Sequence, residues 1–273
     1  MNAEKITRES RSNLALAFIA LDRERRRDIT IFYAFCRLID DIADSTELTV
    51  ERKMRGLSEW RSWIRESAKE ESELAPKVRG LIEKYPITPA MFDEILDGVE
   101  MDLANVRYET FEALRVYCYH VASAVGLVSI EIFGYRNPAC REYAIQLGYA
   151  LQMTNIIRDV GKDLAQGRIY LPREDMARFD YPEADLRQRK QNEAFVRLME
   201  FEAARAEEFF ANAAKLLPRE DRHSMKAAEI MASVYRALLA RMKSDRFQVF
   251  KKEYRLNKLE KLAHIAAQIF RFG

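Results

Sequence analysis

A short stretch near the middle of the chain carries acidic residues at a spacing that suits metal binding. Asp159 and Asp163 are four residues apart, and Asn155 and Gln152 precede them by one and two turns of a helix. On a helix this spacing places all four side chains on one face, and the positions between them are mostly apolar. Buried carboxylates without partners are costly, so these acids are predicted to meet an arginine, a lysine or a metal ion.

An earlier stretch repeats this design. Tyr33, Arg37, Asp40 and Asp44 lie at relative positions 0, 4, 7 and 11, compared with 0, 3, 7 and 11 in the first stretch. A structural salt bridge is the simpler interpretation of any single Asp-x-x-x-Asp pair. Two such pairs on apolar helices favour a cavity lined by four aspartates.

The side-chain types in both stretches favour magnesium. Carboxylate oxygens suit Mg²⁺, which usually keeps several waters and completes its shell with substrate phosphates. Both stretches lack histidine, which zinc or iron would favour, and the chain lacks the Glu-x-x-His pairs of carboxylate di-iron bundles. Arg37, Arg158 and Arg168 lie close to the acids and suit bidentate binding of phosphate. The pattern therefore predicts a site for a diphosphate attached to a hydrocarbon, held through Mg²⁺.

These stretches require helices to position them, and the sequence predicts an all-α fold in one domain over residues 1–273. The chain is 48% hydrophobic, has few glycines and prolines, and shows apolar residues at helical spacing nearly throughout. Asp22 and Thr110 are predicted N-caps. The final helix, near 255–270, is expected to bury Leu259, Leu262, Ala266 and Ile269. The helix that carries the second acidic stripe is expected to start at Asn137-Pro138, to loosen at Gly161 and Gly167, and to stop by Leu171-Pro172. The other expected helices cover about 11–20, 25–44, 49–70, 77–84, 89–105, 111–133, 191–215 and 220–243.

Composition limits the classes of partner and compartment. Lys plus Arg number 45 against 43 Asp plus Glu, which gives no global bias toward nucleic acid. Three scattered cysteines without a C-x-x-C pair indicate neither a zinc site nor a disulfide framework. No secretory h-region and no apolar run approaching about 20 residues is visible, so a cytoplasmic protein is expected.

A basic cluster near the C-terminus leaves two interpretations open. It is most simply a solvated face, and the alternative is a patch that binds the inner face of the membrane peripherally. The oligomeric state is not indicated. The cluster comprises Arg246, Lys251, Lys252, Arg255, Lys258 and Lys261.

The chain resembles the squalene/phytoene synthase family of head-to-head prenyl transferases. The resemblance covers most of the chain and implies a helical isoprenoid synthase fold, with a central cavity lined by two Asp-rich helices. Five motifs in the family's order carry it: Ser10–Ser12, Tyr33–Asp44, Gly98–Asp102, Tyr117–Gly126 and Gln152–Tyr170.

The resemblance also implies roles for individual residues. Tyr117 is expected near the proton that is lost during cyclopropane closure, although on sequence alone it reads as an ordinary core tyrosine. Expected Mg²⁺ ligands are Asp40, Asp44, Asn155, Asp159 and Asp163. Expected contacts with the diphosphates or their surroundings are Ser10, Tyr33, Arg37, Gln152, Arg158, Arg168, Tyr170 and Tyr235. Residues expected to border the prenyl tail are Ala122, Val125 and Gly126.

The implied reaction condenses two farnesyl diphosphates to presqualene diphosphate with release of diphosphate. NADPH is needed only if the reaction continues to squalene. A phytoene-type condensation of two geranylgeranyl diphosphates is the alternative, and Asn13, where the family usually has Phe, keeps substrate length open. A non-catalytic assembly factor is a further alternative, disfavoured because the four aspartates and three motif arginines are intact.

Overall fold

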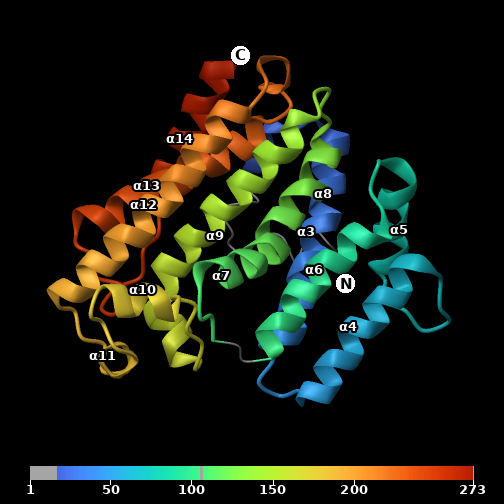
Figure 1. Ribbon diagram of the computed structural model, residues 1–273. Coiled ribbons are helices and arrows are strands. Elements are labelled where there is room, and N and C mark those ends of the chain that lie inside the picture. The colour runs from blue at the N-terminus through green and yellow to red at the C-terminus, as the bar shows by residue number, and fades with distance from the viewer. Residues whose placement is uncertain (1–16, 105–106, 273) are drawn as a thin grey trace.

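The computed structural model describes residues 17–104 and 107–272, and the regular structure of these residues is helical (Figure 1). The elements in chain order are η1 (Phe18–Ala20), α3 (Arg23–Asp44), α4 (Val50–Arg65), α5 (Ala75–Lys84), α6 (Pro89–Leu103), α7 (Phe111–Cys118), η2 (Tyr119–Ser123), α8 (Ala124–Phe133), α9 (Ala139–Ala165), α10 (Arg173–Arg178), α11 (Glu183–Arg187), α12 (Glu193–Leu216), η3 (Arg219–Asp221), α13 (Lys226–Ser244) and α14 (Lys258–Phe272). The predicted all-α class is confirmed.

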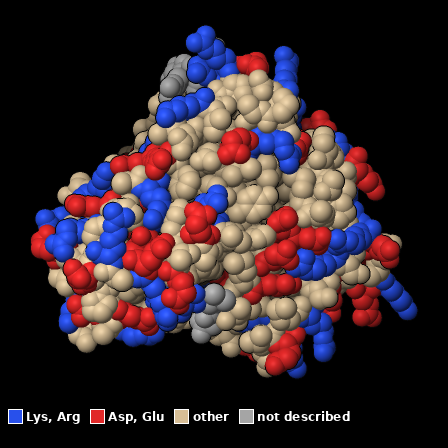
Figure 2. Space-filling view, in the orientation of Figure 1, with Lys and Arg blue, Asp and Glu red and all other residues tan. Residues whose placement is uncertain are grey.

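The two Asp-rich helices lie in the middle of the molecule. Figure 1 shows α3 and α9 flanked by α4–α6 on one side and by α12–α14 on the other. Their inward faces belong to one continuous hydrophobic core that includes Phe32 and Phe35 of α3 and Ile156 and Ile157 of α9. Charged side chains of both signs are interspersed over the face shown in Figure 2, as expected for a nearly balanced composition.

Side-chain caps begin the helices where the sequence predicted them. The carboxylate of Asp22 accepts a hydrogen bond from the backbone N–H of Arg25 at 2.9 Å at the start of α3. Thr110 caps α7 in the same way, accepting from the N–H of Ala113 at 3.2 Å. Each cap satisfies a backbone donor that the first turn leaves without an intrahelical partner.

The apolar run 111–133 is helical throughout but is interrupted by a π-helical turn, η2. Two neighbouring helices press on this turn through glycines. A Cβ on Gly148 of α9 would lie 2.6 Å from Cα of Ser123, and one on Gly98 of α6 would lie 2.8 Å from Cβ of His120. Only residues without side chains permit this approach. The π turn thus lies in a tight crossing that begins two residues after Tyr117.

The same run corrects one expectation. Phe111–Phe133 spans 23 residues and contains an 18-residue window with a mean hydropathy of 1.5, so it is long and apolar enough to cross a membrane by length and composition. More than half of this segment is buried by the surrounding helices. The burial accounts for its apolar character as that of a core helix.

The last helix packs by a different face from the one predicted. Leu259 is 78% exposed and Leu262 is 52% exposed, whereas Ile265 is buried against the protein. His264 turns inward and hydrogen-bonds with Ser233 of α13 at 2.6 Å. The outward face therefore carries an apolar stripe, formed by Leu259, Leu262, Ala263, Ala266 and Ala267.

Candidate active site

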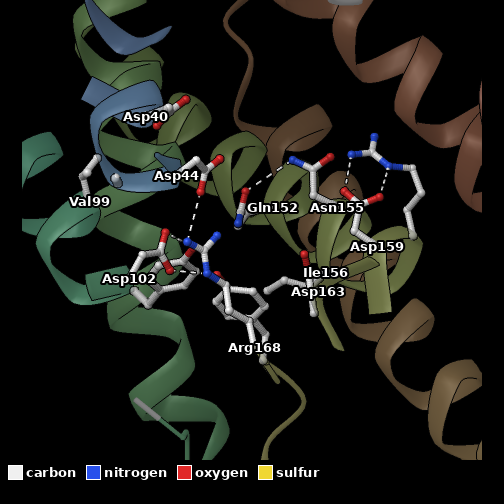
Figure 3. Close-up of a pocket in the computed structure, with 14 residues that line it drawn as sticks. Asp40, Asp44, Val99, Asp102, Gln152, Asn155, Ile156, Asp159, Asp163 and Arg168 are labelled. Atoms are coloured by element: carbon white, nitrogen blue, oxygen red, sulfur yellow. Dashed lines mark hydrogen bonds and ion pairs between the residues drawn. The ribbon is translucent and has the colours of Figure 1, made fainter. Parts of the chain in front are cut away.

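The acidic stretches meet at a cavity of about 260 Å³ (Figure 3). Helices α3 and α9 supply one Asp-x-x-x-Asp pair each, and α6, α7 and the segment after α9 complete the walls. Ten of the predicted site residues line it: Asp40, Asp44, Tyr117, Gln152, Asn155, Arg158, Asp159, Asp163, Arg168 and Tyr170. Four further residues line it: Ala43, Val99, Asp102 and Ile156.

Burial of several carboxyl groups in one place determines the electrostatics of the cavity. Removal from solvent raises the pKa of Asp40 to about 7, with the neighbouring carboxylates of Asp44 and Asp102 adding to the rise and Arg37 opposing it. Asp163 behaves alike, because burial and the charge of Asp159 raise its pKa to about 7. Five carboxyl groups face two guanidinium groups among the lining residues. The cavity is therefore short of positive charge.

Each of the two arginines is already paired with an aspartate. Arg158 binds Asp159 through two hydrogen bonds, from Nε at 2.9 Å and from Nη2 at 2.5 Å. Burial alone would lower the pKa of Arg158, but Asp159 and the hydroxyl of Tyr235 outweigh burial and raise it. Arg168 Nη2 lies 3.0 Å from Asp44 Oδ1 and so joins the segment after α9 to the end of α3.

The donor set fits a hard divalent cation. Oδ1 of Asn155 is buried and has no hydrogen-bond partner among the described residues, while its amide Nδ2 donates to Oε1 of Gln152 at 3.3 Å. An unsatisfied buried carbonyl oxygen among carboxylates is a ready cation ligand. Only oxygens are offered on the acidic stripes, which suits Mg²⁺ better than zinc or copper.

Two tyrosines, Tyr117 and Tyr170, line one side of the cavity. The rings of Tyr117 and Tyr170 stack with centroids 5.2 Å apart at an interplanar angle of 18°, and Tyr108 packs against both. Burial raises the pKa of Tyr117 well above its ordinary value, and nearby Asp102 raises it further. A free tyrosinate is thus disfavoured at neutral pH.

Six predicted site residues within the described part of the chain do not line this cavity. Arg37 is occupied by Asp41 at 2.7 Å, with Asp40 at 3.8 Å. Gly126 packs against the backbone of Ala144, where a Cβ would lie 3.2 Å from the carbonyl oxygen. Tyr33, Ala122, Val125 and Tyr235 also lie outside the lining, so their substrate contacts stay predictions. Ser10 lies outside the described residues.

Asp102 is the main residue that sequence reasoning missed. The Gly98–Asp102 motif contains it, but it is not among the residues for which the sequence predicts a role in the site. Asp102 lies in the last turn of α6, and its two oxygens accept hydrogen bonds from Tyr170 at 2.7 Å and Tyr117 at 3.1 Å. An isolated aspartate near a helix end carries no spacing signal, so only the motif could have identified it.

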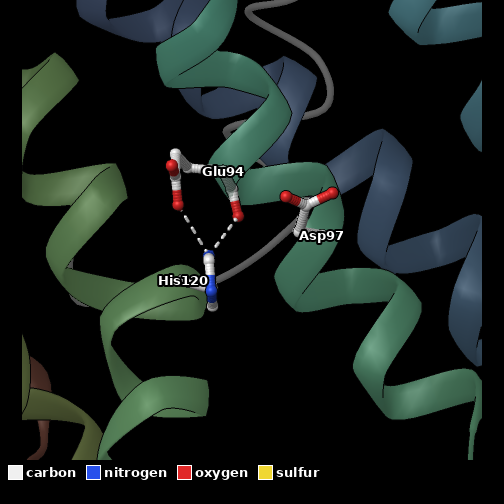
Figure 4. A group of neighbouring side chains, drawn as sticks. All are labelled: Glu94, Asp97 and His120. Carbon is white, nitrogen blue, oxygen red and sulfur yellow. Dashed lines mark hydrogen bonds and ion pairs between the residues drawn. The ribbon is translucent and has the colours of Figure 1, made fainter.

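A second group of metal-capable side chains lies away from the cavity (Figure 4). Nδ1 of His120 lies 2.9 Å from a carboxylate oxygen of Glu94 and 3.1 Å from the backbone oxygen of the same residue. Asp97 forms an ion pair with Arg61 at 2.5 Å. Because these groups already satisfy one another or a neighbouring arginine, the cluster is explained as a structural contact between α6 and η2.

Comparison with known proteins agrees with this geometry. Residues 7–260 match the family described as squalene/phytoene synthase. Among curated relatives, a phytoene synthase of Mycobacterium bovis is 33% identical over 276 residues, covering 97% of this chain and 88% of that protein. A 15-cis-phytoene synthase of Synechocystis is 29% identical, covering 96% and 81%.

Solved structures give the same result. The crystal structure of a dehydrosqualene synthase in complex with ligand superposes with a TM-score of 0.86 at 26% identity, covering 98% of this chain and 94% of that chain. A squalene synthase from Alicyclobacillus acidocaldarius superposes with a TM-score of 0.79 at 25% identity, covering 90% and 93%. The fold is thus the all-α fold of these enzymes. The chain belongs to the squalene/phytoene synthase family, whose members are prenyl transferases.

Proposed function

We propose that the protein condenses two prenyl diphosphates head to head in a Mg²⁺-dependent reaction. Farnesyl diphosphate is the proposed substrate and presqualene diphosphate the proposed product, formed with release of diphosphate. The convergence of five carboxyl groups, two arginines and the unpaired Oδ1 of Asn155 on one cavity carries the proposal. Such a cavity suits a polyanion that enters with its own divalent cations.

The lining residues suit the steps of this reaction. The four motif aspartates and Asn155 would hold Mg²⁺, which supplies positive charge to the diphosphate that leaves C1 of the first substrate. Arg158 and Arg168 lie where they can exchange their aspartate partners for diphosphate oxygens. The 2,3-double bond of the second substrate then attacks C1, and loss of a proton closes the cyclopropane. The apolar side chains of Val99 and Ile156 offer surfaces that exclude water from the cation.

Prenyl chain length separates two candidate substrates. The structural similarity to squalene-type enzymes supports farnesyl diphosphate. The curated relatives named phytoene synthase favour geranylgeranyl diphosphate as the alternative. Both substrates present the same diphosphate to the aspartates, so the difference lies in the depth of the apolar pocket.

Product analysis tests the proposal. The purified protein is incubated with each prenyl diphosphate alone and with both together, with Mg²⁺ or EDTA and with or without NADPH, and products are identified by mass spectrometry. We expect Mg²⁺-dependent presqualene diphosphate from farnesyl diphosphate, and squalene only if the enzyme uses NADPH. Preferential formation of prephytoene diphosphate or phytoene would transfer the assignment to the longer substrate. No diphosphate release in any tube would overturn the proposal.

The matched variants are Asp40→Asn and Asp159→Asn, which remove charge but keep shape. Both are expected to abolish Mg²⁺-dependent product formation. In the cell, a role that survives both substitutions would favour a non-catalytic assembly factor instead.

We further propose that the protein is cytoplasmic and binds anionic membrane surfaces peripherally through α14. The exposed apolar stripe of this helix begins with Leu259 and Leu262 and is accompanied by Lys251, Lys258 and Lys261. An apolar stripe bordered by lysines suits the interface of a bilayer that contains anionic lipid. A product with long prenyl chains would leave toward such a surface.

Vesicle co-sedimentation tests this membrane proposal. We expect binding to vesicles with anionic lipid, weaker binding to neutral vesicles, and loss of binding in the Leu259→Ser/Leu262→Ser variant. Val50→Ser, which changes a 54% exposed side chain on α4, is the control and should bind normally. Binding unaffected by the α14 substitutions would exclude this surface. A concentration-dependent dimer that the same substitutions abolish would assign the stripe to a second copy of the chain.

A further inference from the structure

Asp102 joins three separate parts of the chain at one point. It lies in the last turn of α6, Tyr117 lies in α7, and Tyr170 follows α9. Its Oδ1 accepts the hydrogen bond from Tyr170 and its Oδ2 accepts the one from Tyr117. The two rings stack nearly parallel, and both hydroxyl groups lie beside the same carboxylate.

This arrangement distinguishes Asp102 from the four motif aspartates. Both of its oxygens accept hydrogen bonds from tyrosine hydroxyl groups, whereas Asp40 and Asp163 share their surroundings with other acids. Asp102 is therefore engaged with neutral hydroxyl groups at the cavity wall, whereas Asp44 and Asp159 are paired with arginines.

The hydrogen bonds fix the direction of both hydroxyl protons. A tyrosine hydroxyl has one hydrogen to donate and lone pairs that accept. Because Tyr117 and Tyr170 each give their hydrogen to Asp102, their oxygens offer only lone pairs to anything that occupies the cavity. An acceptor oxygen stabilises a nearby positive charge, whereas a donated hydrogen would oppose it.

We propose that Asp102 is a positioning residue that holds the hydroxyl oxygens of Tyr117 and Tyr170 as acceptors facing the allylic cation. The inference rests on the proposed function and assigns a role within that same site. Asp102 does not take the proton itself. It ensures that the tyrosine oxygens stabilise the cation and guide its proton toward the released diphosphate.

The raised pKa of Tyr117 agrees with this role. Burial and the negative charge of Asp102 keep the phenol protonated, so the hydroxyl acts as a neutral acceptor. The pKa of Asp102 is also raised by burial, while both tyrosine hydrogen bonds and Arg168 oppose the rise. The carboxylate of Asp102 and the two tyrosine hydroxyl groups thus form one hydrogen-bonded group.

The decisive substitution is Asp102→Asn, which keeps the shape but replaces one acceptor oxygen with an amide donor. One tyrosine must then turn its hydrogen away from residue 102. We expect kcat to fall by about tenfold to a hundredfold, while KM for the prenyl diphosphate changes by less than about threefold. We also expect a larger share of prenyl alcohol from cations trapped by water. Asp97→Asn on the outer side of the same helix is the control and should leave kcat and product ratio unchanged.

A double-mutant cycle separates positioning from a direct role. In the Tyr117→Phe/Tyr170→Phe background, Asp102→Asn should lower kcat by less than about twofold, because the hydroxyl groups that Asp102 positions are gone. An undiminished loss in that background would overturn the proposal and indicate direct contact with metal or substrate. Wild-type kcat and product ratio in Asp102→Asn would also overturn it.

Two measurements keep the outcome clear. Circular dichroism and the melting temperature establish that each variant is folded. If Asp102→Asn is unfolded, Tyr117→Phe and Tyr170→Phe are compared singly, and each must raise the share of prenyl alcohol for the proposal to stand. Absence of product from the wild-type enzyme contradicts the proposed function, whereas wild-type turnover that Asp102→Asn retains contradicts only the role of Asp102.

Discussion

At the scale of single residues, the cavity holds more acid than its own arginines can neutralise. Asp159 and Asp44 each have an arginine partner within 3.0 Å. Asp40 and Asp163 have pKa values raised to about 7, chiefly because burial disfavours their charged forms. The protein therefore stores an unfavourable interaction that a divalent cation would relieve.

The first prediction concerns pH. Because the pKa of Asp40 and Asp163 is about 7 in the folded protein and ordinarily 3.8, the metal-free fold binds more protons than the unfolded chain between these values. The contribution of these two carboxyl groups to the stability of the metal-free fold is greatest below about pH 4. It is lost as pH rises through about 7. Mg²⁺ competes with those protons, so the rise in melting temperature on adding Mg²⁺ should be larger at about pH 8 than at about pH 6.

Thermal melts with Mg²⁺ or EDTA at the two pH values check this prediction. The Asp40→Asn/Asp163→Asn variant provides the control, since it should show a small Mg²⁺ effect at both. An equal Mg²⁺ effect at both pH values in the wild-type protein would contradict the assignment.

The second prediction concerns coupling within one stripe. The charge of Asp159 raises the pKa of Asp163, so Asp159→Asn should lower the pKa of Asp163 toward its ordinary value. The change also releases Arg158 from its partner, and the freed positive charge would act in the same direction. Titration of the labelled carboxyl carbons by NMR, without metal, measures the shift. A pKa that stays near 7 would show that burial alone controls it.

At the scale of elements, two glycines set how closely α6 and α9 approach the segment that follows Tyr117. Gly98 of α6 and Gly148 of α9 contact the π turn η2 from different helices, and η2 begins two residues after Tyr117. The helix that carries Tyr117 is thereby held against α6, which carries Asp102. The position of the tyrosine hydroxyl group thus depends on two backbone contacts outside the cavity.

The third prediction follows from this crossing. Gly148→Ala places a Cβ 2.6 Å from Cα of Ser123, so one helix must shift, at a cost of about 1–3 kcal/mol. The melting temperature should fall by about 2–4 °C for each kcal/mol. Gly80→Ala in α5 is the matched control, since a Cβ there meets nothing within 4 Å. Gly80→Ala should raise the melting temperature slightly, because alanine has a higher helix propensity than glycine. A neutral Gly148→Ala would show that the crossing is loose.

The fourth prediction compares the two faces of α14. Ile265→Ala should destabilise by about 2–4 kcal/mol because it empties a buried position. Leu259→Ala changes a side chain that is 78% exposed and should stay within about 0.5 kcal/mol of wild type. Chemical denaturation measures both. A large loss from Leu259→Ala would place that residue against protein instead.

At the scale of the whole molecule, the cavity is a junction between distant parts of the chain. Arg168 joins the segment after α9 to the end of α3, and Asp102 joins α6 to α7 and to Tyr170. A ligand bound there would hold these elements together. Binding energy should therefore stabilise the complete fold.

The fifth prediction tests this linkage with simple probes. Mg²⁺ together with inorganic diphosphate should raise the melting temperature more than the sum of their separate effects, because each supplies charge that the other needs. Asp44→Asn should remove most of this synergy. Independent effects of the two probes would indicate that they bind apart.

Both Asp-x-x-x-Asp stripes and their helices were predictable from sequence, because helical periodicity and ligand chemistry are local properties. N-capping by Asp22 and Thr110 is equally local, and the structure confirms both caps. The sequence also carried the motifs by which the family was recognised.

Only the tertiary structure decided which groups meet across the cavity. The partners of Asp102 lie 15 and 68 residues away along the chain, and no spacing rule connects them. Likewise, the face that α14 turns inward depends on where α13 lies, so Leu259 and Leu262 were wrongly expected to be buried. Local patterns specify helices and ligand types, whereas contacts between helices arise from packing that the whole chain determines.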